Sequence, residues 1–217
     1  YIRPFMIGTE PFIGVRTSDR YIFSIITGPT ASYYDEAISV LVYDSYVRST
    51  KGGYGNAKAA GNYAGTLYPV EVAKQKGYKD VLWLDGEHKK YLNEVGTMNI
   101  FLVIDGKLVT PEIDGTILDG ITRNSIITIA KDLGYEVEER PISIDEVIEA
   151  YNNKTLTEMF GTGTAAVVNP VNRFGYKEKD YLLDEKTFKV AHQLKETLIG
   201  IQKCTQKDTF NWVTQIV

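Results

Sequence analysis

The pair Asp105-Gly106 stands between two runs of apolar residues, MNIFLVI (98–104) and KLVT (107–110). An Asp-Gly pair between such runs is the strongest short-range signal for a two-residue hairpin, because both turn residues must take positive φ angles. A hairpin joins its flanking segments as antiparallel strands. We therefore predict a sheet that is at least partly antiparallel.

Further segments rich in aromatic and β-branched residues, the composition of strands, lie on both sides of this hairpin. The first 48 residues contain four of them: YIRPFMIG, PFIGV, YIFSIIT and ISVLVYD. Later in the chain come DVLWLDG, YLNEVG and YEVEERPI. We expect the stretch EMFGTGTAAVVNPV to be one apolar strand that Gly-Thr-Gly-Thr interrupts.

Helix signals are fewer and more widely spaced than the strand signals. A first helix is expected to begin near Tyr63 or Thr66 and to end at Gly77. The last predicted helix spans about 184–203. Its apolar residues recur at spacings of three and four, which indicates one buried stripe: Phe188, Ala191, Leu194, Leu198 and Ile201.

Two other helices begin at recognisable caps. Thr122 is expected to cap a helix that ends at about Leu133, and Ser143 with Glu146 forms a capping box for a short helix to about Tyr151. Strands dominate, with hairpins and a few helices between them. We predict an α+β fold with one main domain and an antiparallel or mixed sheet at its core.

Composition excludes several functional classes. A net charge of −4 without a basic stripe argues against nucleic-acid binding. The longest apolar runs, such as IFLVI (100–104), are too short to cross a bilayer, so no membrane partner is expected. The single cysteine, Cys204, excludes an internal disulfide, and the two scattered histidines, His88 and His192, predict no metal site.

A glycine- and alanine-rich stretch, KGGYGNAKAAGNYAG (51–65), surrounds Lys58 with small residues. It matches neither a P-loop nor a dinucleotide fingerprint, because Lys58 follows Ala57 and stands where a third glycine belongs. One interpretation is a flexible loop with a solvated lysine. The other is a lysine that forms a Schiff base, with Tyr63 placed to bond a phenolate oxygen on a flat cofactor ring.

Three more motifs have one structural and one functional interpretation each. Glu94, in NEVGTMN, is either an exposed strand position or a carboxylate that keeps a pyridoxal ring nitrogen protonated. The segment 118–122, LDGIT, opens a helix, whose first N–H groups either are simply capped or bind an anion. The segment 161–165, GTGTA, is either a turn or a second backbone anion site. Together the motifs supply what pyridoxal phosphate and a substrate carboxylate need.

The order GNAK, GNY, NEVGTMN, LDGITR and FGTGTA resembles the branched-chain amino-acid aminotransferases over nearly the whole chain. These are class IV (fold type IV) pyridoxal-phosphate enzymes. The resemblance implies their large domain, with a mixed or antiparallel sheet core and surrounding helices. It implies that residues 1–34 are the end of the interdomain region and the first strands, that 35–217 form the large cofactor-binding domain, and that the family's smaller N-terminal domain is missing.

The resemblance also implies roles in holding pyridoxal 5′-phosphate. Lys58 would form the Schiff base and carry a proton between the substrate Cα and the cofactor C4′, Tyr63 would bond the ring hydroxyl oxygen, and Glu94 would pair with the pyridinium nitrogen. Backbone N–H groups of Ile121 and Thr122 and the hydroxyl of Thr164 would bind the phosphate. The full cofactor set is Lys58, Tyr63, Glu94, Thr97, Leu118, Gly120, Ile121, Thr122 and Thr164.

A second set of residues would face the substrate. Thr164 and Ala165 would hold its carboxylate through their N–H groups, and Tyr33 would lie in the interdomain loop. The full set is Tyr1, Arg3, Tyr33, Thr97, Gly163, Thr164 and Ala165.

The implied reaction is transamination of leucine, isoleucine or valine with 2-oxoglutarate. The intact protein is expected to be a cytoplasmic homodimer, and this piece alone need not turn over. The alternatives are a D-amino-acid aminotransferase or an aminodeoxychorismate lyase on the same fold, or a non-catalytic cofactor-binding fragment.

Overall fold

A computed structural model describes residues 1–29 and 36–216 of the chain. The chain divides into two compact units, Tyr1–Tyr33 and Tyr34–Val217. The expected domain boundary between residues 34 and 35 falls outside the described residues, so it stays a prediction.

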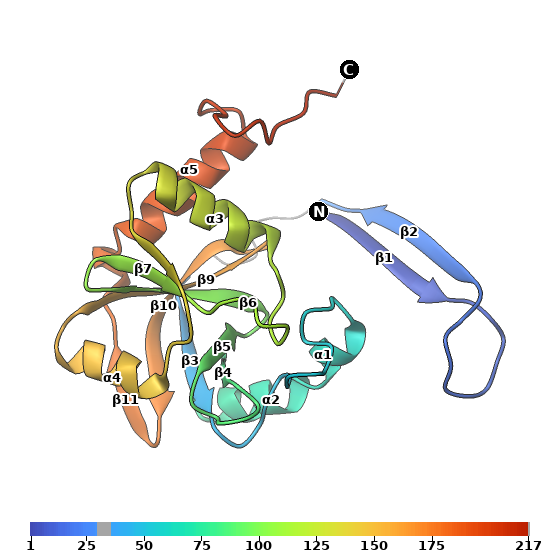
Figure 1. Cartoon of the computed structure of the whole chain (residues 1–217), viewed down its shortest axis with the longest axis horizontal. Coiled ribbons are helices and arrows are strands. Elements are labelled where there is room, and N and C mark those ends of the chain that lie inside the picture. Colours follow the sequence, from blue (N-terminus) through green and yellow to red (C-terminus); the bar gives the residue numbers. More distant parts are fainter. Residues whose placement is uncertain (30–35, 217) are drawn as a thin grey trace. The chain divides into compact units, whose positions relative to one another are not determined.

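The first unit is a hairpin of two antiparallel strands, β1 (Ile2–Gly8) and β2 (Tyr21–Thr27) (Figure 1). The prediction of a further strand at PFIGV (11–15) is wrong, because this segment belongs to the loop between β1 and β2. Glu10 closes that loop by accepting hydrogen bonds from Arg16 and from the N–H of Asp19. Gly14 also has a φ of 150°, which interrupts a regular strand.

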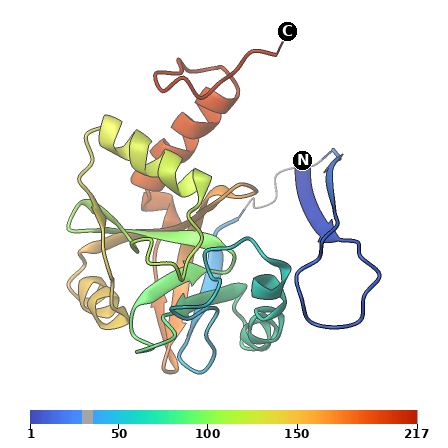
Figure 2. The same ribbon diagram turned by 45° about the vertical axis from the view of Figure 1, so that its right-hand side comes forward.

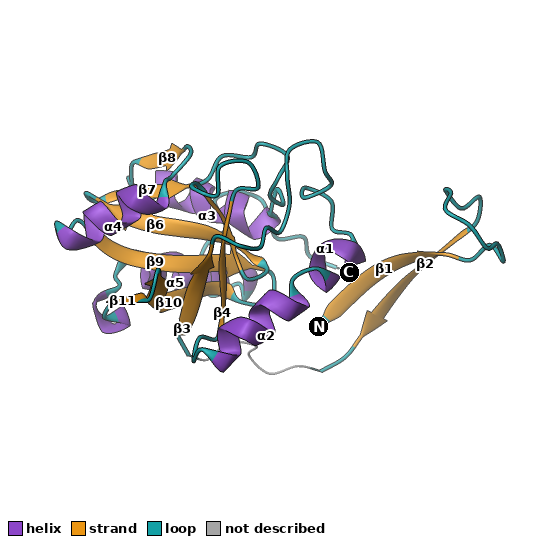
Figure 3. Cartoon of the chain, turned by 90° about the horizontal axis from the view of Figure 1, so that it is seen from below, coloured by secondary structure: helices purple, strands orange, loops and turns teal. Residues whose placement is uncertain are grey.

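The second unit is built on one nine-stranded sheet. Its strands are β3 (Ile38–Tyr43), β4 (Asp80–Leu84), β5 (Leu92–Val95), β6 (Met98–Ile104), β7 (Lys107–Thr110), β8 (Val137–Glu139), β9 (Leu156–Gly163), β10 (Val167–Tyr176) and β11 (Lys179–Leu182). The path runs β11-β10-β3-β4-β5-β6-β7-β8, and β9 pairs with both β10 and β6. The strands β10, β3, β4, β5, β6 and β9 therefore form a closed ring (Figure 3).

Parallel and antiparallel pairs both occur in this sheet. β3 is parallel to β4 and β10, and β7 is parallel to β8, whereas the other pairs are antiparallel. This confirms the predicted α+β fold with a mixed sheet core. The hairpin at Asp105-Gly106 is also confirmed, with φ angles of 50° and 77° at its two residues.

The stretch EMFGTGTAAVVNPV forms two strands, not the one interrupted strand that we expected. β9 ends at Gly163 and β10 begins opposite it at Val167, so the segment 164–166 is a turn. The small Gly and Thr residues permit this reversal, and Val167 completes it with a φ of 57°.

Five α-helices are found in the described part of the chain: α1 (Ala60–Ala64), α2 (Leu67–Gln75), α3 (Ile121–Asp132), α4 (Ile144–Asn152) and α5 (Val190–Gln202). The first predicted helix is thus two helices. Thr122 is not the cap of α3, because Gly120 occupies that position. Ser143 does cap α4, where its hydroxyl accepts the N–H of Glu146 at 3.1 Å.

The last helix begins later than predicted. A 3₁₀ turn, η1 (Glu185–Thr187), precedes α5, and the side chain of Asp184 accepts the N–H of Lys186 there. The carboxylate of Glu158, on β9, accepts the N–H groups of Lys189, Val190 and Ala191 and so defines the first turn of α5. The predicted apolar stripe is buried: Phe188, Ala191, Leu194, Leu198 and Ile201.

Apolar side chains pack on both faces of the ring. Successive residues of β6 alternate between two hydrophobic clusters. Ile100 and Leu102 belong to the first cluster, and Phe101 and Val103 belong to the second. The second cluster fills the space under α3 and α5, which lie side by side (Figure 2). A third cluster packs α2 on Trp83 of β4. In the described residues, every helix is too short or too polar to traverse a bilayer.

Candidate functional site

Lys58 and Tyr63 form a direct pair at the start of α1. The amine Nζ of Lys58 donates a hydrogen bond of 2.6 Å to the hydroxyl of Tyr63. The loop that carries Lys58 is fixed from within, because the side-chain amide of Asn62 donates to the backbone oxygens of Tyr54 and Ala57, each at 2.8 Å. The amine is therefore held at the molecular surface in a defined position.

Glu94 lies on β5 with only 4% of its surface exposed. Its Oε1 accepts the N–H of Leu118 at 3.1 Å and the side-chain amide of Asn99 at 3.3 Å. Burial raises the pKa of Glu94 to about 7, although the charges of Arg48 and Lys58 and the hydrogen bond from Leu118 oppose that rise. The carboxyl group is thus poised to change protonation near neutrality.

Arg48 is the charged partner of Glu94, and the sequence interpretation missed it. Its Nε lies 2.8 Å from Oε2 of Glu94, but the N–H direction does not satisfy hydrogen-bond geometry, so the contact is an ion pair. Its Nη2 donates to the backbone oxygens of Gly55 and Thr116. The only signal in the sequence was a lone arginine shortly after a buried strand.

The side chains of Tyr63 and Glu94 line the same cleft. Ten residues line it: Arg48, Gly55, Ala57, Asn62, Tyr63, Thr66, Glu94, Gly96, Thr97 and Leu118. The structure therefore brings together four predicted residues, Tyr63, Glu94, Thr97 and Leu118, and Lys58 joins them through Tyr63. Lys58 is also close enough to Glu94 for its charge to affect the carboxylate.

The N-terminus of α3 is connected to this cleft through Asn99. The amide of Asn99 donates to the backbone oxygen of Leu118 at 2.9 Å as well as to Glu94. Gly120 follows, and a Cβ there would lie 2.2 Å from Oδ1 of Asn99. No side chain caps the helix, so the N–H groups of Ile121 and Thr122 remain available to an anion.

The predicted residues Gly163, Thr164 and Ala165 lie at the end of β9 and in the turn that follows it. Thr162 of β9 stands opposite Asn99 of β6, which places this turn beside the strand that supports Glu94. Thr164 and Ala165 are exposed. The hydroxyl of Thr162 is buried and has no hydrogen-bond partner among the described residues.

For three predicted residues the structure gives no position relative to this arrangement. Tyr33 lies outside the described residues. Tyr1 and Arg3 lie in the first unit, where Arg3 Nη2 contacts the hydroxyl of Tyr1 at 3.3 Å. Their assignment to the substrate stays a prediction. The described residues also contain no group of three or more His, Cys, Asp or Glu that could hold a metal ion.

Comparison with known proteins gives one consistent result. The family model described as amino-transferase class IV matches residues 1–174. Branched-chain-amino-acid aminotransferase 2 of Bacillus subtilis is 50% identical over 220 residues, which cover 100% of this chain and 61% of that protein. A chloroplastic branched-chain-amino-acid aminotransferase of Arabidopsis thaliana is 43% identical and is covered to 52%.

Solved structures agree over almost the whole chain. A branched-chain aminotransferase from Thermoproteus uzoniensis, crystallised with norvaline, superposes with a TM-score of 0.85 at 28% identity, and the match covers 99% of this chain and 68% of that one. An aminotransferase from Brucella abortus, bound to the cofactor PLP, gives a TM-score of 0.78 at 25% identity, over 93% of this chain and 68% of that one. The chain spans 61% of the length of the first curated relative.

Proposed function

Since the chain belongs to the class IV aminotransferases, we propose that its cleft binds pyridoxal 5′-phosphate and that the whole protein transaminates branched-chain L-amino acids. The amino-group acceptor would be 2-oxoglutarate. The observation that carries this proposal is that Tyr63, which bonds the amine of Lys58, and the buried carboxylate of Glu94 line one cleft. For the chain alone we propose cofactor binding, and we assign turnover to the whole protein.

The residues present fit this cofactor. The amine of Lys58 and the phenol of Tyr63 form one pair, and the cleft that Tyr63 lines also contains the buried carboxylate of Glu94. The uncapped first turn of α3 offers N–H groups to a phosphate. We assign Lys58, Tyr63, Glu94, Thr97 and the segment 118–122 to the cofactor, together with Thr164. When bound, pyridoxal phosphate supplies an electron sink for the carbanion formed at the substrate Cα.

Lys58 is proposed to move the proton. Its Nζ would take the proton from the substrate Cα and deliver it to C4′ of the bound cofactor. The hydroxyl of Tyr63, 2.6 Å away, positions that amine. The N–H groups of Thr164 and Ala165 would bind the substrate carboxylate and orient the Cα proton toward Lys58.

Glu94 is proposed to act as an anion in the cleft. A proton on the ring nitrogen opposite Glu94 would lower the pKa of the carboxyl group from about 7, because opposite charges stabilise each other in a buried site. Arg48 supports the same charge state from behind. With the carboxylate of Glu94 charged, a proton on the ring nitrogen would stay on that nitrogen and would not transfer to Glu94.

The preference for branched-chain amino acids is supported by the names of the relatives, which are 43–50% identical to this chain. The homodimer and the cytoplasmic location are proposals that follow from the family resemblance. Analytical ultracentrifugation of the whole protein tests the first, and a monomer at micromolar concentration would contradict it.

The test of the cofactor proposal is a visible spectrum. Protein incubated with pyridoxal phosphate and then separated from the unbound cofactor should keep an absorbance band that borohydride abolishes, and Lys58→Ala treated in the same way should lack it. Lys76→Ala, at an exposed lysine after α2, is the matched control and should keep the band. A borohydride-sensitive band in Lys58→Ala would refute the assignment. For the whole protein, a panel of L- and D-amino acids scored for product decides between the branched-chain interpretation and the alternatives.

A further inference from the structure

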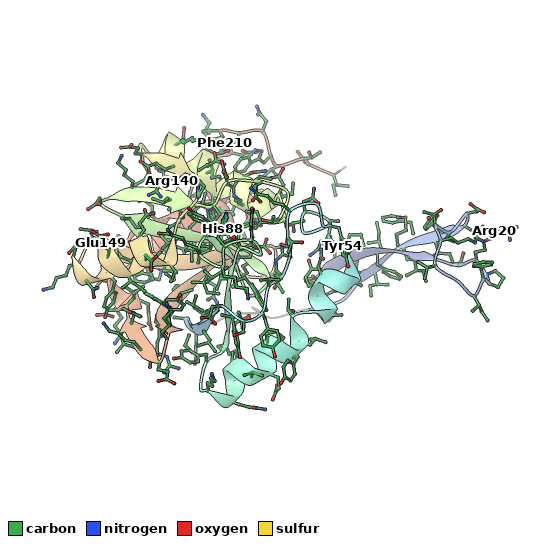
Figure 4. All side chains as sticks on the ribbon, turned by 60° about the horizontal axis from the view of Figure 1, so that its bottom comes forward. Arg20, Tyr54, His88, Arg140, Glu149 and Phe210 are labelled. Carbon is green, nitrogen blue, oxygen red and sulfur yellow. The ribbon has the colours of Figure 1, made fainter. Side chains whose placement is uncertain are left out.

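A second cavity adjoins β5 and shares no lining residue with the cleft described above. Its volume is about 240 Å³, and it is bounded by the loop between β4 and β5, by the segment 111–117 and by Lys51 and Pro141. The apolar part of its wall consists of Tyr91, Leu92, Pro111, Ile117 and Pro141. His88, on the loop between β4 and β5, also lines it and is labelled in Figure 4.

The two sites are separated by consecutive residues of one strand. Asn93 lines this cavity and the next residue of β5, Glu94, lines the cofactor cleft, and the two linings have no residue in common. Asn93 is only 4% exposed. The cavity is therefore a site of its own and not an extension of the cleft.

The buried amide of Asn93 has one atom without a partner. The hydroxyl of Thr116 donates its single hydrogen to Oδ1 of Asp114 at 2.6 Å, so it can only accept from Asn93. This fixes the orientation of the amide, whose Nδ2 donates to Thr116 Oγ1 at 2.9 Å. Oδ1 of Asn93 is then a buried acceptor without a partner among the described residues, which calls for a ligand that donates a hydrogen bond.

The charges around the cavity favour a cation. Four carboxylates line it: Asp85, Glu87, Glu112 and Asp114. The basic side chains in its lining are one lysine, Lys51, and one histidine, His88. The carboxylate of Asp85 is already occupied by four backbone N–H groups. Glu112 and Asp114 form no ion pair with a lysine or arginine in the part of the chain that the structure describes.

We propose that this cavity binds a small primary ammonium compound with a short apolar body. The ammonium group donates a hydrogen bond to Oδ1 of Asn93 and is attracted by the carboxylates of Asp114 and Glu112. The apolar body packs on Leu92 and Ile117. Neither the lysine nor the carboxylate of the cofactor cleft takes part, so this site can exist whether or not the proposed aminotransferase function holds.

The experiment is a calorimetric titration of cofactor-free protein with 3-methylbutylammonium at pH 7. Without the cofactor the amine cannot react at the first site. Saturable one-site binding is expected, and the uncharged isostere 3-methylbutanol should bind at least tenfold more weakly. Absence of saturation by the ammonium compound, or equal affinity for the alcohol, would overturn the proposal.

Substitutions of residues that line the cavity test whether the ammonium compound binds there. Asn93→Leu should weaken affinity at least tenfold, whereas Asn93→Asp, which keeps an acceptor, should retain it. The exposed Asn153→Leu is the matched control and should bind as the unaltered protein does. Because Asn93→Leu also loses its bond to Thr116, Glu112→Gln provides a second test at an exposed residue. A severalfold loss there is expected, and unchanged affinity in Glu112→Gln would refute the role of the carboxylates.

Discussion

The amine of Lys58 and the hydroxyl of Tyr63 lie 2.6 Å apart across the start of a five-residue helix, α1. The helix is too short to be stable alone, since isolated helices of this length are marginal in water. Its position depends on the bonds of Asn62 to the preceding loop. The pair therefore depends on a local framework in which the side chain of Asn62 holds the backbone oxygens of Tyr54 and Ala57.

Removal of the Tyr63 hydroxyl should misplace the amine of Lys58. For Tyr63→Phe in the whole protein we expect turnover to fall at least tenfold, in keeping with the size of proton-transfer contributions. Steady-state kinetics measures the effect. Tyr54→Phe, in the same loop and labelled in Figure 4, is the control and should change turnover less than twofold. Equal effects of the two variants would contradict a positioning role.

Neutralising Glu94 should affect chemistry more than cofactor binding. Glu94→Gln keeps the shape of the side chain but removes the charge proposed to hold the ring nitrogen protonated. We expect turnover to fall about a hundredfold or more, with a much smaller change in affinity for pyridoxal phosphate. Parallel kinetic and cofactor-titration measurements separate the two. Near-normal turnover would remove the electrostatic argument.

Glu94 should also give the cofactor-free protein a distinctive pH dependence. Its pKa is about 7 in the folded state against an ordinary 4.5, so the folded state binds more protons than the unfolded state between these values. The free energy of unfolding should therefore fall as pH rises from 4.5 to 7, by on the order of 3 kcal/mol from this group. Urea unfolding of the unaltered protein and of Glu94→Gln measures this, and the variant should show the smaller fall.

A side chain at Gly120 should disturb the support of the cleft. A Cβ there would meet Oδ1 of Asn99 at 2.2 Å, so Asn99 would have to move away from Glu94 and Leu118. We expect Gly120→Ala to lose about 1–3 kcal/mol of stability and to bind pyridoxal phosphate more weakly. Gly65→Ala, where a Cβ would find ordinary contact distances, is the control for both measurements.

The buried carboxylate of Glu158 should be important for stability and not for the cleft. It accepts three N–H groups at the start of α5. In Glu158→Gln an amide nitrogen replaces one acceptor, and we expect a loss of about 2 kcal/mol in the free energy of unfolding. Glu149→Gln, on the exposed side of α4 (Figure 4), should change it by less than about 0.5 kcal/mol. Equal losses would show that the capping contacts do not stabilise α5.

Local signals predicted much of this architecture. The hairpin at Asp105-Gly106, the cap at Ser143 and the stripe of α5 each depend on residues close in the sequence, and all three were confirmed. The class IV family was also identified from ordered motifs and is confirmed by the family model. Such features need no knowledge of distant contacts.

Features set by distant contacts were missed. Arg48 pairs with Glu94 and binds Thr116, and nothing near it in the sequence indicates either partner. The start of α5 is set by Glu158, which lies 31 residues before Lys189. The double pairing of β9 likewise depends on strand register, which the alternation of apolar residues does not specify between strands.

Closure of the ring has a mechanical consequence for the cleft. An open sheet can admit a slipped strand at its margin, but in a ring a slip of β5 or β6 would have to be absorbed by every other member of the circuit. Substitutions that change substrate preference are therefore expected mainly in the connecting loops. Substitutions that would shift the register of a strand in the ring are expected to be poorly tolerated.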